Sequence, residues 1–251
     1  MSAVASRWPA WSMLAGTCAV AALVGYSLLR YPHTLDDPVA PAYIVLLSGL
    51  LATYLGLAGW ALRRVRPGSS AGTLVGVLAA VAWSLEIWAG GPSNLDGRLE
   101  SIVGGSFALL AVAITLAAGV LAGARERGAR VLASARARDA RVLAGRGVAT
   151  AMWAGLFAGL ASGIGVFCFA VAMTLTNLGI LGARADYQRQ FATGHSHAPD
   201  MATFLVGDGL AAGTAHLVIN LVLGLIGGGL AALVSNALGA ASQPAGGTRP
   251  S

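Results

Sequence analysis

Long apolar runs recur along the chain, and they constrain its fold more than any other feature. Six stretches are nearly free of charge and are each long enough to cross a hydrocarbon core about 30 Å thick as a helix. They cover about residues 8–30, 42–62, 71–90, 101–123, 149–173 and 203–236. Only 10% of the 251 residues are charged and the mean hydropathy is +0.72, whereas soluble domains average about 25% charged residues. We therefore predict an all-α, polytopic six-helix transmembrane bundle that forms one integral membrane domain over residues 1–251.

The first and last runs need separate interpretation. The first is longer than the apolar region of a typical signal peptide, so we expect it to remain as a span. The last is too long for one perpendicular crossing, because a helix from Phe204 to Val234 rises about 46 Å. The part after the three glycines 227–229 is too short to cross again. We expect one tilted or broken helix there, followed by a short disordered tail over residues 239–251.

The arginines predict the orientation of these spans. All sixteen basic residues are arginine, and twelve lie in the two terminal tails or directly after spans two and four. Arginine-rich connections stay in the cytoplasm, so we predict that both termini are cytoplasmic (N-in, C-in). A composition rich in alanine, glycine and arginine without lysine is typical of GC-rich bacterial genomes, which favours the plasma (inner) membrane. The bilayer, and not nucleic acid, is the expected partner of the basic charge.

The longest basic connection covers residues 124–147. Its apolar residues recur at helical spacing between the arginines, which predicts an amphipathic helix lying on an inner leaflet with anionic lipids. A solvated connection that only sets the topology explains the same charge. The arginines concerned are Arg125, Arg127, Arg130, Arg136, Arg138, Arg141 and Arg146.

The residue types that are missing exclude several kinds of chemistry. Without lysine there is no Schiff base to retinal or pyridoxal phosphate and no phosphate-binding lysine of a P-loop. The two cysteines, Cys18 and Cys168, both lie inside apolar runs, which is incompatible with a disulfide framework or a zinc ribbon. We expect no cofactor. The expected protein partners are a second copy of the chain or a membrane partner subunit.

Two patterns of repetition concern packing. The sequence Pro-x-x-Leu-Asp occurs at 32–36 and again at 92–96, which indicates a possible repeat of helical hairpins between spans one and two and spans three and four. Gly155, Gly159 and Gly163 follow one another every four residues in span five. Small residues on one face allow helix backbones to pack closely in lipid; the alternative is that some of these glycines act as hinges along a substrate path.

Ionisable residues inside spans are costly and are therefore candidates for function. The sequence places Glu86 in span three and Asp208 and His216 in span six, with Asn220 as a polar neighbour. The last three fall within an arc of about 120° on one helix. We weigh two interpretations: His216 makes a structural hydrogen bond between helices, or Asp208 and His216 relay a proton or ion.

Ser106 in span four and His216 in span six raise a catalytic alternative. This placement of serine and histidine in a six-helix, N-in bundle resembles the rhomboid intramembrane proteases. The resemblance implies an intramembrane serine hydrolase in which His216 activates Ser106. The chain departs from that family at Phe107, which stands where the family has glycine, and span two holds no histidine or asparagine to stabilise an oxyanion.

The connection over residues 182–201 is the largest feature on the predicted outer side. Its sequence includes His195, His197 and Asp200, which could supply nitrogen and oxygen ligands to zinc or copper. The alternative is a loop with ordinary solvated histidines. We favour a non-catalytic protein, either a permease-like bundle for a small solute or ion or an accessory bundle for a membrane partner.

Overall fold

The computed structural model of the protein describes residues 7–36, 38, 40–63, 69–93, 97–134, 140–193 and 197–241. Within these ranges only the backbone is described for residues 119, 122–134, 140–147, 235–236 and 238–241.

Helices form nearly all of the described chain, and no strand occurs within it. Six of these helices are long and apolar enough to cross a membrane, which confirms the predicted six-helix transmembrane class. They are α1 (Trp8–Arg30), α2 (Ala40–Arg63), α3 (Ser69–Gly90), α4 (Gly97–Ser134), α5 (Ala140–Thr176) and α8 (Met201–Ala241). Three short helices join them: η1 (Pro32–Leu35), α6 (Leu178–Gly182) and α7 (Ala185–Ala192).

The last span is one continuous helix. A helix satisfies every backbone N–H and C=O within its own segment, and in lipid no water is present to replace those hydrogen bonds. This explains why α8 is unbroken across the glycines 227–229. The helix also includes residues 239–241, which the sequence assigned to a disordered tail; residues 242–251 of that tail lie outside the described residues.

The basic connection differs from its sequence-based prediction. Residues 124–134 continue α4 and residues 140–147 form the beginning of α5, so the backbone prolongs two spans and does not form a separate surface helix. No proline interrupts the chain between residues 124 and 134, so each span continues as a helix into the polar region. The side chains of the seven arginines lie outside the described residues, and their contact with lipid stays a prediction.

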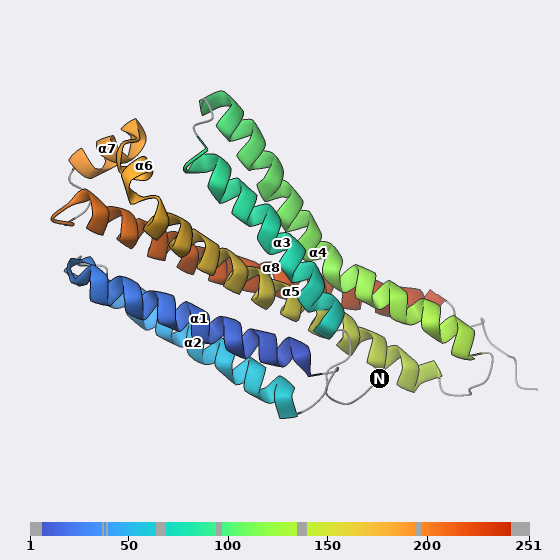
Figure 1. Ribbon diagram of the computed structural model, residues 1–251. Coiled ribbons are helices and arrows are strands. Elements are labelled where there is room, and N and C mark those ends of the chain that lie inside the picture. The colour runs from blue at the N-terminus through green and yellow to red at the C-terminus, as the bar shows by residue number, and fades with distance from the viewer. Residues whose placement is uncertain are drawn as a thin grey trace, which may run out of the picture.

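Helices α5 and α8 lie at the centre of the bundle. The α1–α2 hairpin packs on one side of them and the α3–α4 hairpin on the other (Figure 1). The larger apolar core joins α1, α2, α5 and α8 around Phe157, Phe167 and Leu217, and a smaller one joins α3, α4 and α5 around Trp83 and Val166. The two hairpins therefore have separate cores on opposite sides of the α5–α8 pair.

Glycines bring the backbones of α5 and α8 into direct contact. A Cβ atom added at Gly155 would lie 2.5 Å from the carbonyl oxygen of Gly224, and one at Gly159 would overlap the carbonyl oxygen of Asn220. Dispersion forces between closely spaced backbones stabilise such contacts in lipid. The glycine faces of α5 and α8 thus fit against each other as one unit.

The two hairpins differ in how closely they approach this unit. On α3, Gly72 and Gly76 leave no room for a Cβ against the backbone of α5. In the α1–α2 hairpin, by contrast, Gly25 and three glycines of α2 have no neighbouring atom within 4 Å of a Cβ, and Gly16 meets only the side chain of Ile164. Side chains therefore mediate the contacts of the α1–α2 hairpin, whereas the α3–α4 hairpin is joined to α5 through its backbone.

The bundle has two distinct ends. Helices η1, α6 and α7 and the connection from α3 to α4 lie at one, which we call the α6–α7 end. The last residues of α2 and α4 and the first residues of α3 and α5 lie at the opposite end (Figure 1). At the α6–α7 end the α3–α4 hairpin leans away from α5 and α8 (Figure 1). Polar groups gather at this end.

Candidate functional site

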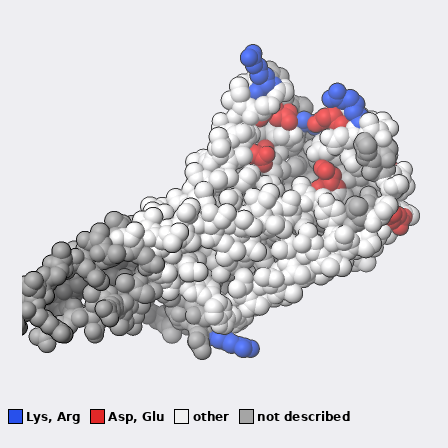
Figure 2. Space-filling model, turned by 180° about the vertical axis from the view of Figure 1, so that it is seen from behind, with Lys and Arg blue, Asp and Glu red and all other residues white. Residues whose placement is uncertain are grey.

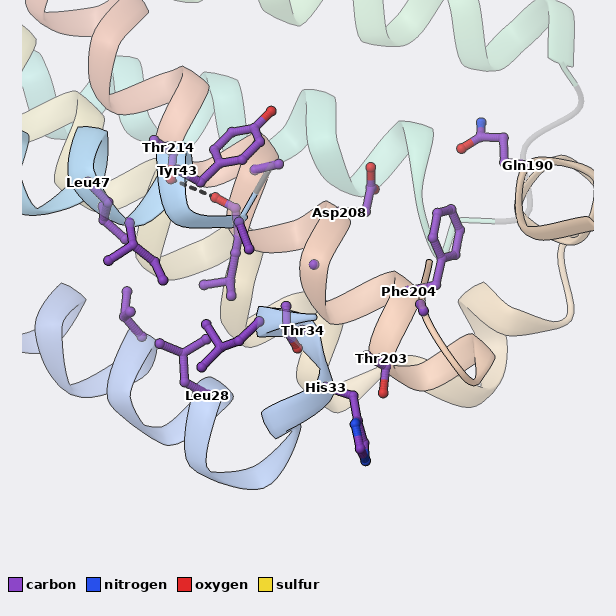
Figure 3. A pocket seen from close by; sticks show the side chains of 18 of the residues that line it. Leu28, His33, Thr34, Tyr43, Leu47, Gln190, Thr203, Phe204, Asp208 and Thr214 are labelled. Atoms are coloured by element: carbon purple, nitrogen blue, oxygen red, sulfur yellow. Dashed lines mark hydrogen bonds between the residues drawn. The ribbon is translucent and has the colours of Figure 1, made fainter. Parts of the chain in front are cut away.

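A cavity of about 470 Å³ lies at the α6–α7 end between the α1–α2 hairpin and α8. Residues of α1, η1, α2, α7 and α8 line it, so several helices and not one loop form its walls (Figure 3). Binding sites for small molecules have typical volumes of about 300–1,000 Å³. The cavity is therefore large enough for a small solute.

The cavity changes from polar to apolar along the bundle axis. His33 and Gln190 lie near its mouth at the α6–α7 end, and both side chains are labelled in Figure 3. Deeper in the bundle the walls are apolar, with Val24 of α1, Leu47 of α2 and Leu210 of α8. A molecule that fills this space meets water at one end and hydrocarbon side chains at the other.

Asp208 is the acidic residue in the cavity wall. It lies two turns into α8, one turn after Phe204, and the side chains of both residues line the cavity. Its carboxylate is exposed and has no hydrogen bond or ion pair with any described residue. An ionised carboxylate in a membrane-spanning helix is costly unless water or a cation compensates it. Asp208 is therefore available to a ligand.

Two basic side chains of α1 and η1 have partners of their own. The Nδ1 atom of His33 lies 2.8 Å from Oδ2 of Asp36, and both side chains are exposed. The guanidinium of Arg30 lies 5.4 Å from the ring centroid of Tyr31, a cation–π distance. Among the described residues, neither of these side chains forms a hydrogen bond or ion pair with Asp208.

Arg184 organises a second polar cluster beside α6 and α7. Its Nε and Nη2 atoms donate to the two carboxylate oxygens of Asp186, each at 3.0 Å. The Nη2 atom also donates to the carboxylate of Glu100 on α4 at 3.2 Å, and the Nη1 atom donates to the carbonyl oxygen of Gly91. One guanidinium thus ties the α6–α7 segment to the end of the α3–α4 hairpin. A cleft of about 420 Å³ lies here, and Figure 2 shows acidic side chains gathered around a hollow.

This ion pairing changes the pKa values of its members. The hydrogen bond from Arg184 lowers the pKa of Asp186, and the hydrogen bond to Asp186 is the main cause that raises the pKa of Arg184. Burial raises the pKa of Tyr187 on α7 to about 12, and the charges of Asp208 and Asp186 act in the same direction.

The other polar residues of the spans lie away from the cavity. The Oδ1 atom of Asn220, which is fully buried, accepts a hydrogen bond from Ser162 of α5 at 2.9 Å, and its Nδ2 atom donates to the carbonyl oxygen of His216. The His216 ring packs against Trp83 of α3 with 4.8 Å between ring centroids. Glu86 lies beside Gly104 of α4. Asn220 is thus held in a hydrogen bond between α5 and α8.

His216 and Trp83 form an unusual pair, because the Nδ1 atom of His216 and the Nε1 atom of Trp83 are both buried without a hydrogen-bond partner among the described residues. Their rings meet at 65°, an edge-to-face arrangement that is favourable for aromatic groups. His216 does not line the cavity that contains Asp208. The relay from Asp208 through His216 remains a sequence-based prediction without a connecting contact here.

The residues of the catalytic alternative do not contact each other. The Ser106 side chain is exposed on α4, and its hydroxyl donates to the carbonyl oxygen of Ile102 at 2.7 Å. The His216 ring, as described above, faces Trp83 on α3. No hydrogen bond joins serine to histidine in the described contacts, so this geometry offers no activated nucleophile.

The proposed metal ligands fall partly outside the description. His195 is not among the described residues, and His197 is exposed. Asp200 precedes α8, where its Oδ1 atom accepts a hydrogen bond from the Thr203 backbone N–H at 2.8 Å; this is the role of a helix N-cap. In the part of the chain that the structure describes, no group of three His, Cys, Asp or Glu residues could hold a metal ion. Metal binding by this loop stays a prediction.

Sequence reasoning missed three features of this end of the molecule. It assigned no role to the α1–α2 hairpin, which forms one side of the cavity. It passed over Ser162, whose only signal was a serine at a glycine-rich face, and Arg184, whose only signal was the acidic residue two positions later, Asp186. Comparison of the chain with protein-family models, with curated proteins and with solved structures found no match.

Proposed function

We propose that this chain is a non-catalytic, permease-like membrane protein that admits a small solute into the cavity between the α1–α2 hairpin and α8. The observation that carries the proposal is the cavity itself, which combines a size suited to a small solute with an unpaired carboxylate at Asp208. A gap filled by lipid tails does not explain an ionised group in its wall, because a charge in hydrocarbon is costly. A path for a solute explains it.

The packing below the cavity supports a path that is open at one end and closed at the other. Tyr54 of α2 is buried, and its hydroxyl donates to the carbonyl oxygen of Leu217 at 3.1 Å. Gly163 of α5 allows this contact, because a Cβ there would lie 2.8 Å from the Tyr54 hydroxyl oxygen. The Ser162–Asn220 hydrogen bond follows one turn further along α8. Together these contacts close the bundle beneath the cavity.

The contrast between the hairpins suggests which part moves during transport. The α3–α4 hairpin and α8 both pack on α5 through backbone contacts at glycine, which favours one rigid unit. The α1–α2 hairpin is held by side chains such as Tyr54 and Ile164, so it can rock against that unit by rearranging rotamers. Motion of one helical unit against another around a central site is the general mode of secondary transporters.

The arginine distribution assigns a direction to this scheme. The arginine-rich connections belong to the end opposite α6 and α7, and such connections stay in the cytoplasm. On this basis the cavity opens away from the cytoplasm, both termini are cytoplasmic, and the protein resides in a plasma membrane.

Solute flux into proteoliposomes tests the proposal. Purified protein is reconstituted, and stopped-flow light scattering follows the entry of a panel of cationic, zwitterionic and neutral organic solutes. We expect at least one solute to enter faster than into empty liposomes. Ala211→Trp fills the cavity and should abolish this entry, whereas Ala212→Trp, at an exposed neighbour that does not line the cavity, should preserve it.

A cysteine at the same position tests the cavity without knowledge of the solute. In a background without Cys18 and Cys168, Ala211→Cys should react with a water-soluble methanethiosulfonate, because the reaction needs a hydrated thiolate. The proposal is wrong if no solute of the panel enters faster than into empty liposomes and this cysteine stays unreactive.

A further inference from the structure

The walls of the cavity carry information about the charge and shape of its ligand. The cavity has a volume of about 470 Å³, and Asp208 is the one acidic residue among the described residues that line it. The Asp208 carboxylate has no hydrogen-bond or ion-pair partner among the described residues. Arg184 of the second polar cluster already binds Asp186, Glu100 and a backbone carbonyl. Among the described residues no basic side chain pairs with Asp208, so its carboxylate is available to a cationic ligand.

Two aromatic side chains line the same cavity as Asp208. Phe204 lies one helical turn before Asp208 on the same face of α8, and Tyr43 lines the cavity from α2. The face of an aromatic ring carries negative potential and attracts cations, most strongly where water is excluded. The aromatic rings and the carboxylate of Asp208 therefore both favour a positively charged ligand.

The remaining walls favour an apolar body. Leu28 of α1 and Leu47 of α2 face the cavity in Figure 3, and Leu210 lines it from α8. Burial of apolar surface against such side chains is favourable by roughly 25 cal/mol per Å². A small inorganic cation would leave this surface wet, and an anion would be repelled by Asp208.

We propose that the cavity binds an organic cation with an apolar body, whose charged group lies beside Asp208 and whose body lies between the α1–α2 hairpin and α8. This inference rests on the proposed function, because it names the class of solute for the same cavity. It predicts selectivity by charge between ligands of equal size and shape.

Tetraphenylphosphonium and tetraphenylborate provide such a matched pair, since they share their shape and differ in the sign of their charge. Equilibrium dialysis against the full-length protein in a neutral detergent, with empty micelles subtracted, measures the binding of each ion. We expect the cation to bind at least about 10-fold more tightly than the anion. Asp208→Asn should weaken cation binding by about 10- to 100-fold, the range expected for the Coulombic attraction between two unit charges about 6 Å apart at an effective dielectric constant of roughly 20–40.

Two control variants separate the possible outcomes. Asp36→Asn removes a carboxylate near the mouth that His33 already binds, and it should leave the preference for the cation intact. Ala211→Trp should weaken the binding of both ions by filling the cavity. Equal binding of the two ions to the unmodified protein, or a preference that survives Asp208→Asn, overturns the cation inference.

The failure of this inference is distinguishable from failure of the proposed function. If both ions bind alike and Ala211→Trp abolishes both, the cavity admits solutes but does not select cations. A cavity filled by lipid tails gives the same equal and weak binding of the two ions, and Ala211→Cys then stays unreactive in proteoliposomes. In that case the proposed function fails as well.

Discussion

Replacement of Gly159 by alanine is expected to separate α5 from α8. The added Cβ would overlap the carbonyl oxygen of Asn220 and lie 3.0 Å from Cα of Gly224, whereas ordinary contacts of a Cβ lie at 3.4–4 Å. The helices must therefore move apart by roughly 1 Å, and a gap of that size removes a quarter to a half of the dispersion energy of each contact. Overpacking of this kind costs about 1–3 kcal/mol.

The same movement affects the hydrogen bond between Ser162 and Asn220. At 2.9 Å it leaves little tolerance, and it lies within one turn of Gly159. Loss of this hydrogen bond adds about 0.6 kcal/mol to the destabilisation, the average for such bonds in a membrane protein. The higher helix propensity of alanine offsets about 0.8–1 kcal/mol of it. The net decrease in the free energy of unfolding is therefore expected to be about 0.6–2.8 kcal/mol.

Gly229→Ala is the matched control. It makes the same substitution inside a span, one residue from the glycine contact, but no atom lies within 4 Å of the added Cβ. Reversible unfolding in mixed micelles of mild detergent and dodecyl sulfate measures both variants. Gly229→Ala should be neutral or slightly stabilising. If Gly159→Ala matches it within about 0.5 kcal/mol, the backbone contact between α5 and α8 does not exist and the reasoning from it is wrong.

Three further predictions follow from the polar contacts. Ser162→Ala leaves the buried Oδ1 atom of Asn220 without its donor and should lower the free energy of unfolding by about 0.5–2 kcal/mol in the same assay; an unchanged value contradicts this role. Arg184→Gln should increase hydrogen–deuterium exchange in residues 91–100 and 182–192, whereas Arg189→Gln, whose Nε atom donates only within its own helix, should not. The pKa of Asp186 lies below its ordinary value of 3.8, so its ion pair with Arg184 stabilises the α6–α7 end above pH 3.8 and is lost as the pH falls through the lowered pKa. Hydrogen–deuterium exchange in the same residues should therefore rise on acidification from pH 5 to about pH 2.5. Exchange that does not depend on pH, after correction for the intrinsic rate, refutes this prediction.

The span pattern was predictable because its cause is local. A run of about 20 apolar residues must form a helix in lipid whatever its neighbours are. The glycines of α5 are also visible in the sequence by their spacing, and the structure places Gly155 and Gly159 against α8. Asp208 could be singled out in the same way, because a charged residue is rare within a span.

Features that depend on which helices meet were not predictable. Nothing in the sequence of α1 or α2 indicates that Leu28 and Leu47 line the same cavity as Asp208, because this depends on how the hairpin packs against α8. The pairing of His216 with Trp83, instead of a polar residue of α5, has the same origin. These features arise from tertiary packing, which local periodicity does not record.

The basic connection shows a limit of periodicity itself. Residues 124–147 have the spacing of an amphipathic helix, but a helix that continues a span has the same spacing. The sequence therefore could not distinguish a separate surface helix from the extended ends of α4 and α5 that the backbone shows.

The most direct test of the account is the side of the membrane on which each end of the bundle lies. In a background without Cys18 and Cys168, single cysteines are placed at Gln190, an exposed residue at the cavity mouth, and at Arg136 in the basic connection. A membrane-impermeant maleimide should label the cysteine at position 190 in intact cells and the cysteine at position 136 only after permeabilisation. Labelling of both positions in intact cells, or of position 136 alone, would contradict the six-span layout and the outward-facing cavity together.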